Sequence, residues 1–255
     1  MKKTIDLNCD MGESYGVYRL GEDQAAMPLI SSANVACGFH ASDPDNMRKT
    51  VQLAKKHGVA IGAHPAYPDL VGFGRRQMAL TSDEIEAVIL YQLGALHGFC
   101  RAEGLSMQHV KAHGALYNKA EQDANTAMAI AKAIQKFDPK LIMVCMANSA
   151  MTKAAQEIGL PYAQEVFADR AYTSQGTLVS RKLPGAVVHD LKEVIARVVQ
   201  MVEQQTVTTI DGIILPIQAD TICVHGDTPG AVEMIAGIRH AIEAAGFEVK
   251  AMGKA

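Results

Sequence analysis

The feature that most constrains the fold is a regular alternation, along the whole chain, of short apolar runs with longer amphipathic segments. The runs that we predict as strands are 4–9, 32–37, 59–63, 109–113, 141–146, 162–166 and 221–225, with a weaker eighth at 247–251. Repeated strand–helix units predict an α/β protein whose parallel sheet has helices outside it. Seven or eight units fit either a closed barrel or an open, doubly wound sheet.

Helix signals separate most of the predicted strands. Asp43 is the expected N-cap of a helix over 44–57, and Gly58 is its expected end. Thr81 and Glu84 form a capping box at the start of a second, longer helix. Further helix boundaries are expected at Asp190 with Glu193, at Thr228–Pro229 with Gly246, and between Asn148 and Gly159.

Segment 207–217 departs from this alternation. It carries Asp211–Gly212 between runs rich in β-branched residues, a pattern typical of a two-residue hairpin turn. We therefore expect a small hairpin on the rim of the sheet. The chain has no Ser- or Pro-rich linker and no repeat of 20–50 residues, which predicts a single domain over 1–255.

Polar residues inside two predicted strands distinguish a barrel from an open sheet. The first strand carries Asp6, Asn8 and Asp10 at alternate positions, and the fourth carries His109, Lys111 and His113. Residues two apart point to the same side of a strand. Both faces of an open parallel sheet are packed under helices, where these groups would be unpaired. In a barrel they can meet inside, so we predict a TIM-like (β/α) barrel with seven or eight parallel strands.

Composition narrows the class of partner and the cell compartment. The 24 Lys and Arg nearly balance the 27 Asp and Glu, which favours a small-molecule substrate over nucleic acid or a membrane surface. No apolar stretch approaches the ~20 residues that span a bilayer. The five Cys are scattered without CxxC spacing, so we expect free thiols, no structural zinc site and a cytoplasmic protein.

Ionisable side chains recur where the predicted strands end, the edge at which (β/α) barrels carry their functional groups. In strand order these residues are Asn8, Asp10 and Glu13; His40 and Asp43; His64 and Asp69; Lys111, His113 and Tyr117; Glu165, Asp169 and Arg170; and His225 and Asp227. A single His at such a place is more often structural than catalytic, and Asp227 is explained equally well as a helix cap. Burying so many charged groups costs free energy that a structural role alone does not explain. Their convergence from separate strands therefore predicts a functional pocket.

Standard nucleotide and hydrolase motifs are absent from the sequence. We find no GxxxxGK[ST] loop, no GxGxxG after a strand, no GxSxG elbow and no HExxH helix. Any nucleotide would therefore bind by an unconventional route or through a partner.

Six long blocks resemble the signature blocks of one known family. They are DLNCDMGESYG (6–16), SANVACGFHASDP (32–44), GVAIGAHPAYPDLVGFGR (58–75), VKAHGALYN (110–118), EVFADRAY (165–172) and ADTICVHGDTPGA (219–231). In this order, across roughly the whole chain, they resemble the LamB/YcsF family. Ala112 departs from the Pro expected in many relatives, but it lies between the inward-facing Lys111 and His113 and leaves their placement unchanged.

This resemblance implies a distorted barrel of the glycoside hydrolase/deacetylase type. It also implies an activity, the ATP-dependent opening of 5-oxo-L-proline to L-glutamate, with two other 5-oxoprolinase subunits as partners. The implied cofactor is ATP, with or without magnesium.

Opening a lactam in this way needs a base for water, donors for developing charge, and groups that bind carboxylate or phosphate. Asp10 is our first candidate base and Glu13 the second; His40, His64 and His113 are candidate donors. The expected substrate- or phosphate-binding residues are Asn8, Lys111, Asp169, Arg170, His225 and Asp227.

Two alternatives remain open at this point, and no residue is assigned as a metal ligand. The first is a metal-dependent deacetylase or amidohydrolase, in which Asp10, His64 and His113 would bind a divalent ion. The second is a non-catalytic subunit that binds substrate while its partners carry out the chemistry.

Overall fold

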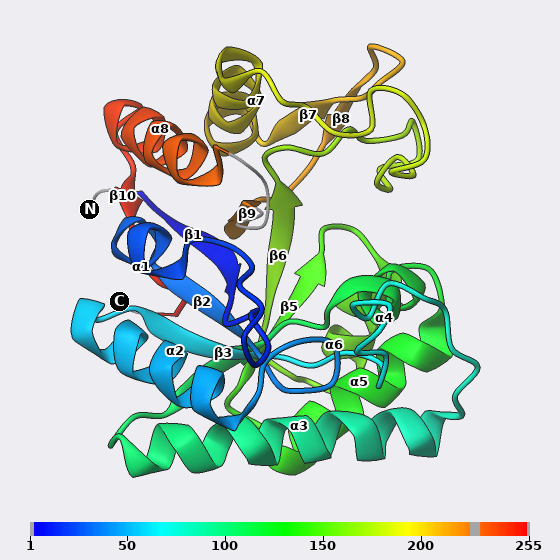
Figure 1. Ribbon diagram of the computed structural model, residues 1–255. Coiled ribbons are helices and arrows are strands. Elements are labelled where there is room, and N and C mark those ends of the chain that lie inside the picture. Colours follow the sequence, from blue (N-terminus) through cyan, green and yellow to red (C-terminus); the bar gives the residue numbers. More distant parts are fainter. Residues whose placement is uncertain (1–2, 225–229, 254–255) are drawn as a thin grey trace.

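The computed structural model describes residues 3–224 and 230–253, and its centre is a closed barrel of parallel strands (Figure 1). The seven strands of the ring are β1 (Thr4–Met11), β2 (Ser32–Ala36), β3 (Ala60–His64), β4 (Met107–Val110), β5 (Ile142–Met146), β6 (Tyr162–Phe167) and β9 (Thr221–Val224). The ring closes because β9 pairs with both β6 and β1. The predicted barrel is therefore confirmed. The weaker eighth strand, β10 (Glu248–Val249), pairs with β1 outside the ring.

Helices surround the barrel (Figure 1). They are α1 (Asp23–Ala26), the 3-10 helix η1 (Met27–Leu29), α2 (Pro44–His57), α3 (Ser82–Ala102), α4 (Gly114–Ala120), α5 (Ala124–Phe137), α6 (Ala150–Glu157), α7 (Leu191–Gln204) and α8 (Ala231–Ala244). Two predicted caps are confirmed: Asp43 accepts from two backbone N–H groups of α2, and Thr81 forms the capping box with Glu84. The helix start predicted at Thr228–Pro229 lies outside the described residues. No helix is predicted from the sequence for 114–137, where α4 and α5 lie.

A long excursion between β6 and β9 distorts the barrel. Residues 168–220 contain α7 and the hairpin of β7 (Thr206–Thr208) and β8 (Ile214–Pro216). The predicted hairpin is confirmed, although residues 209–213 form its loop in place of a two-residue turn. Arg197 of α7 donates to the Thr208 carbonyl at 3.3 Å, which fastens the hairpin to the helix.

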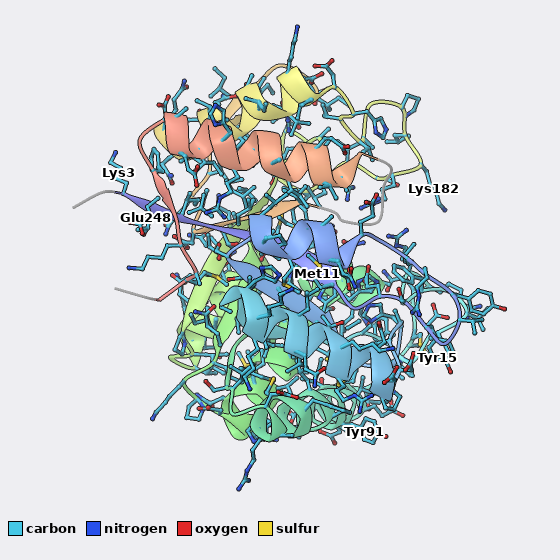
Figure 2. The ribbon with its side chains drawn as sticks, turned by 60° about the vertical axis from the view of Figure 1, so that its left-hand side comes forward. Lys3, Met11, Tyr15, Tyr91, Lys182 and Glu248 are labelled. Carbon is cyan, nitrogen blue, oxygen red and sulfur yellow. The ribbon has the colours of Figure 1, made fainter. Side chains whose placement is uncertain are left out.

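The core is aliphatic, and all five cysteines are buried in it as free thiols, as the sequence predicted. Among the described residues, no helix is both long and apolar enough to cross a membrane. The loop after β1 projects from the barrel, with Tyr15 near its tip (Figure 2). Glu13 lies at the start of this loop, next to the mouth of the barrel.

Candidate active site

The barrel interior contains a layer of buried polar side chains. We call this the lumen layer; its members are Asp6, Asn8, Asn34, His109, Glu165 and Thr221, each at most 1% exposed. The Asn8 amide donates to Glu165 Oε1 at 3.1 Å and to Thr221 Oγ1 at 2.7 Å. The Asn34 amide donates to Asn8 Oδ1 at 2.8 Å, and its own carbonyl accepts from Nε2 of His109 at 2.8 Å. The period-two placement inferred from the sequence is confirmed.

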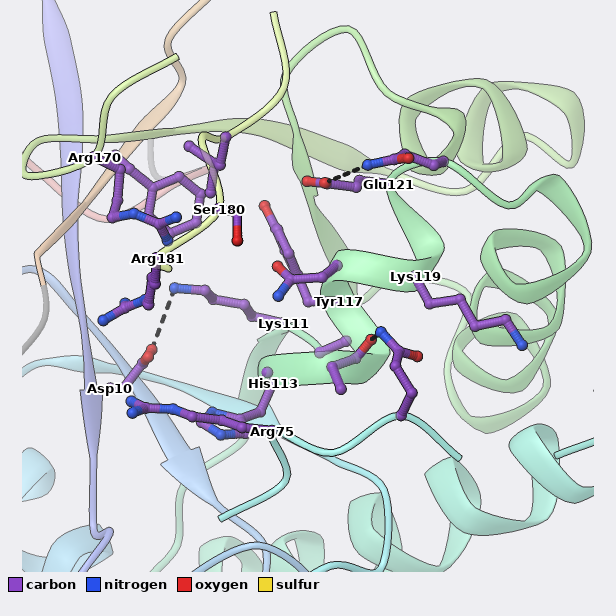
Figure 3. A pocket seen from close by; sticks show the side chains of 18 of the residues that line it. Asp10, Arg75, Lys111, His113, Tyr117, Lys119, Glu121, Arg170, Ser180 and Arg181 are labelled. Carbon is purple, nitrogen blue, oxygen red and sulfur yellow. Dashed lines mark hydrogen bonds and ion pairs between the residues drawn. The ribbon is translucent and has the colours of Figure 1, made fainter. Parts of the chain in front are cut away.

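Lys111 connects this layer to the mouth of the barrel. Its ammonium lies 2.8 Å from Glu165 Oε1 and 3.2 Å from Asp10 Oδ1 (Figure 3). Asn8 Oδ1 and Cys223 Sγ also contact it, at 3.2 and 3.0 Å. Burial alone would lower the pKa of Lys111, but the two carboxylates outweigh burial and raise this pKa well above its ordinary value. The lysine is therefore charged and already neutralised by this chain.

Four side chains form a second group at the mouth. We call the group of Glu13, His40, His64 and His113 the mouth cluster; one ligand-type atom from each lies within 4.8 Å of the others. His113 Nδ1 is 2.9 Å from His64 Nε2, and His40 Nε2 is 3.0 Å from Glu13 Oε1. Asp10 joins the cluster from the side, with Oδ2 3.3 Å from His64 Nε2.

The backbone places the mouth cluster. His113 N–H donates to the Pro65 carbonyl at 2.8 Å, which continues the strand pairing beyond β4 and keeps His113 facing inward. Gly74 has a φ of +64°, and a Cβ there would come within 2.8 Å of both His113 and His40. Close packing of the two rings therefore needs glycine at this position. On the other side, Asn46 of α2 donates to the carbonyls of residues 12 and 14 at 2.6 and 3.0 Å, which fixes the loop around Glu13.

Burial controls the charge of the imidazoles. It lowers the pKa of His113 to about 3, with the neighbouring His64 adding to the effect. Burial also lowers the pKa of His40 well below its ordinary value. Both rings are thus neutral near pH 7, the form in which an imidazole offers a nitrogen lone pair.

A cavity of about 880 Å³ opens above these groups (Figure 3). Of the residues predicted from the sequence, those that line it are Asp10, Glu13, His64, Lys111, His113 and Arg170. Its outer wall adds four further cations, Arg75, Lys119, Arg181 and Lys182. Carboxylates and imidazoles at the floor, with cations around the wall, suit a small anionic ligand.

The remaining predicted site residues lie elsewhere. Asn8 is below the cavity floor in the lumen layer, and His40 lies behind the cluster, stacked on His113 with ring centroids 3.8 Å apart. Arg170 donates to the carbonyls of residues 179 and 186, while its neighbour Asp169 is outside the cavity lining. The predicted His225 and Asp227 lie outside the described residues.

Sequence reasoning missed Asn34, and it placed Glu165 at the end of its strand without predicting its partner. Asn34 alternates with Ser32 in β2, the same period-two signal that identified the inward residues of β1 and β4. Glu165 is the counter-ion of Lys111 and accepts from the Tyr117 hydroxyl at 2.8 Å. A carboxylate in the apolar run of β6 was a signal of this pairing.

Comparison with known proteins gives relatives over nearly the full length. The chain is 52% identical to the A-type subunit of 5-oxoprolinase from Syntrophobacter fumaroxidans over 248 residues, 97% of this chain and 98% of that protein. It is 54% identical to the A-type subunit of 5-oxoprolinase from Thermococcus onnurineus over 250 residues, 98% of each chain.

Solved structures agree with the fold. The lactam utilization protein from Thermus thermophilus superposes with a TM-score of 0.94 at 48% identity, over 98% of this chain and all of that one. A family 4 carbohydrate esterase from Streptomyces lividans shares the fold alone, with a TM-score of 0.53 and 13% identity over 98% of this chain and 93% of that one. The LamB/YcsF family model matches residues 5–255, and the chain belongs to this family.

Proposed function

We propose that this chain is the A-type subunit of an ATP-dependent 5-oxoprolinase, which opens 5-oxo-L-proline to L-glutamate and works with two other subunits. The observation that carries the proposal is the cavity at the barrel mouth, where a carboxylate base and imidazoles meet a wall of cations. More than half of the residues are shared with proteins named as this subunit of 5-oxoprolinase, which supports the same reaction. We also propose a cytoplasmic location, which fits five free thiols.

The chemistry explains why ATP is needed. The five-membered lactam is an unstrained amide with a poor leaving group. Transfer of the γ-phosphoryl group of ATP to the amide oxygen releases ADP and activates the ring carbon. Water then adds to that carbon, the carbon–nitrogen bond breaks as the ring nitrogen takes a proton, and phosphate departs.

The residues at the cavity floor fit two parts of this reaction. Asp10 lies at the floor, where its carboxylate can accept the proton of the attacking water. The substrate carboxylate requires a cation, and Arg170 with the outer-wall residues Arg75 and Arg181 supplies guanidinium groups. Lys111 acts from below, since its ammonium already pairs with Asp10 and Glu165.

The basic wall also bears on the fit of a nucleotide. Lys119, Lys182 and the arginines provide charge for phosphate groups, although the sequence has no phosphate-binding loop. ATP binding by the isolated chain, measured by calorimetry with and without magnesium, distinguishes a site here from a site on a partner.

Reconstitution tests the proposal against its alternatives. The chain is assayed alone and with its two partner subunits, with and without ATP, by the formation of glutamate and ADP. We expect coupled turnover only in the complete mixture with ATP. ATP-independent hydrolysis by the chain alone would indicate a metal-dependent amidohydrolase, and full activity of the partners without the chain would reject a catalytic role.

A further inference from the structure

Two nitrogen lone pairs face each other in the mouth cluster. Nδ1 of His64 is 2.8 Å from the Lys111 carbonyl oxygen, and Nε2 of His113 is 2.9 Å from the Phe73 carbonyl oxygen. A carbonyl oxygen only accepts hydrogen bonds, so each of these nitrogens carries a proton. The other ring nitrogens, His64 Nε2 and His113 Nδ1, lie 2.9 Å apart, so a proton or another cation is needed between their lone pairs.

Carboxylate oxygens approach the same point. Asp10 Oδ2 is 3.3 Å from His64 Nε2, and Glu13 Oε1 is 3.6 Å from His113 Nδ1. These four atoms offer lone pairs around one point, where a cation would be attracted to all of them. One proton could bridge a single pair, whereas a metal ion can contact several at once.

We propose that His64 Nε2, His113 Nδ1 and the Glu13 carboxylate bind one divalent transition-metal ion, zinc or an ion with similar preferences. Two imidazoles with one carboxylate are a ligand set of catalytic zinc sites, and they disfavour magnesium and calcium. At a metal–ligand distance of about 2.1 Å, tetrahedral ligand atoms lie roughly 3.4 Å apart. The separations here, 2.9 Å for the two nitrogens and 3.6 Å for His113 to Glu13, bracket that value.

The surroundings fit a metal site in two ways. The two backbone carbonyls that fix the tautomers of His64 and His113 are the outer contacts that orient metal-binding imidazoles. All three ligands also line the cavity, which leaves a coordination position toward substrate or water.

His40 has a different part in this arrangement. Its ring is nearly parallel to that of His113, with an interplanar angle of 9°, so one ion cannot lie in the plane of both rings. Its Nε2 contacts Glu13 Oε1 at 3.0 Å. We therefore assign His40 as a positioning residue for Glu13. Asp10 is the second carboxylate beside the ion, with Oδ1 already engaged by Lys111.

Metal titration of the full chain tests the proposal. Protein stripped by dialysis against a chelator is titrated with Zn²⁺ by calorimetry and with Co²⁺ by visible absorption. We expect one saturable equivalent. His113→Ala and Glu13→Gln should each weaken metal binding by roughly 100-fold or more. Loss of a residue that only hydrogen-bonds to a metal ligand costs about 10- to 100-fold in affinity, and loss of a ligand itself should cost at least as much. The matched control is His57→Gln, which alters an exposed histidine at the end of α2 and should bind as the parent does.

Thermal unfolding of the stripped proteins checks that the variants are folded, and the conservative Glu13→Gln serves if His113→Ala is not. The proposal is overturned if the parent binds neither ion with one-to-one stoichiometry. It is equally overturned if the ligand variants bind as tightly as His57→Gln. The experiment measures binding and not turnover of 5-oxoproline, so the metal site and the proposed function can fail separately.

Discussion

The lumen layer and the mouth cluster are both groups of buried polar side chains in one barrel, but their hydrogen bonding differs. In the lumen layer, donors meet acceptors along a chain: the amides of Asn8 and Asn34 alternate donor and acceptor atoms from Thr221 to His109. Nδ1 of His109 is an exception, without a hydrogen-bond partner among the described residues. In the mouth cluster, His40 donates to Glu13, but the ring nitrogens of His64 and His113 face each other. From this difference we infer that the lumen layer positions the strands, whereas the mouth cluster binds a cation or substrate.

Asp10 lies between the two groups and contacts both. Its Oδ1 accepts from Lys111 at 3.2 Å and from Asn34 at 2.9 Å, while Oδ2 faces His64. Asn34 and Lys111 therefore fix the orientation of the carboxylate that we propose as the base. Substitutions in the lumen layer should chiefly change stability, and substitutions at the mouth should chiefly change ligand binding and turnover.

The largest effect is expected for Lys111→Met. Removing the ammonium leaves Glu165, which is fully buried, without its counter-ion, and Asp10 loses the same partner. Breaking a buried ion pair from one side costs about 3–5 kcal/mol. Urea denaturation should show a loss of this size, and the assembled enzyme should lose its activity.

Two further variants distinguish the contribution of the Lys111 charge to stability from the contribution of its packing. Lys182→Met changes an exposed lysine of the cavity wall and should leave the free energy of unfolding almost unchanged. Adding Glu165→Gln to Lys111→Met removes the stranded charge and should recover part of the stability. No recovery would mean that packing, and not the ion pair, is what Lys111 contributes.

The next largest effect is a loss of turnover in Asp10→Asn. The asparagine can keep an acceptor toward Lys111 and present a donor to His64, so stability should change little. It has no basic oxygen, and removal of a general base costs about 10²-fold or more in rate. Glutamate formation by the assembled enzyme measures this, with Asp45→Asn on the exposed surface of α2 as the control.

The two roles discussed for Asp10 differ in their response to metal. A ligand variant would regain activity in excess divalent ion, whereas a variant that lacks the base would not. Near-normal turnover of Asp10→Asn would exclude both roles for Asp10.

The sequence predicted the barrel, its strands and most of the mouth because these depend on patterns that are local or repeat at period two. Polar residues at every second position of β1, and of β4 and the residues after it, were enough to place Asp10, Lys111 and His113 on the inner side of the barrel. The same signal at Ser32 and Asn34 in β2 was available but not used.

What the sequence could not supply is pairing across strands. An inward-facing lysine suggests an anionic ligand, but Lys111 is matched by Glu165, a residue 54 positions away on another strand. The tautomers of His64 and His113 likewise depend on two main-chain carbonyls whose direction no residue type encodes. Contacts of this kind form only because closure of the strand ring brings residues that are distant in the sequence together.

A smaller effect is expected when the lumen layer is crowded. A Cβ at Gly62 of β3 would lie 2.1 Å from ring atoms of His109, so Gly62→Ala must displace that ring and break its bond to Asn34. Overpacking of this kind costs about 1–3 kcal/mol. Gly94→Ala in α3 meets no atom within 4 Å and should raise stability by about 0.5–1 kcal/mol. Urea denaturation measures the free energy of unfolding of both variants. If Gly62→Ala changes this free energy in the same way as Gly94→Ala does, His109 can move aside freely.

The last effect, a gradual one, is the dependence of stability on pH that His109 contributes. Burial, together with the charge of Lys111, lowers the pKa of His109 from 6.5 to about 3. Between these values the unfolded chain binds a proton that the folded chain does not, so the free energy of unfolding falls as the pH falls through this window. One proton corresponds to about 1.4 kcal/mol per pH unit. Above pH 6.5 the residue is neutral in both states and contributes no slope.

His109→Gln removes this titration while keeping a donor for Asn34. Its stability, measured by urea denaturation from about pH 4 to 6, should fall less steeply than that of the parent, by about one proton. His57→Gln, which alters an exposed histidine on the surface, should keep the parent's slope. If the two variants have the same slope, His109 accepts a proton in the folded barrel. The lumen layer would then accommodate a positive charge, a property that we assign to the mouth cluster alone. The contrast between the two regions would be lost.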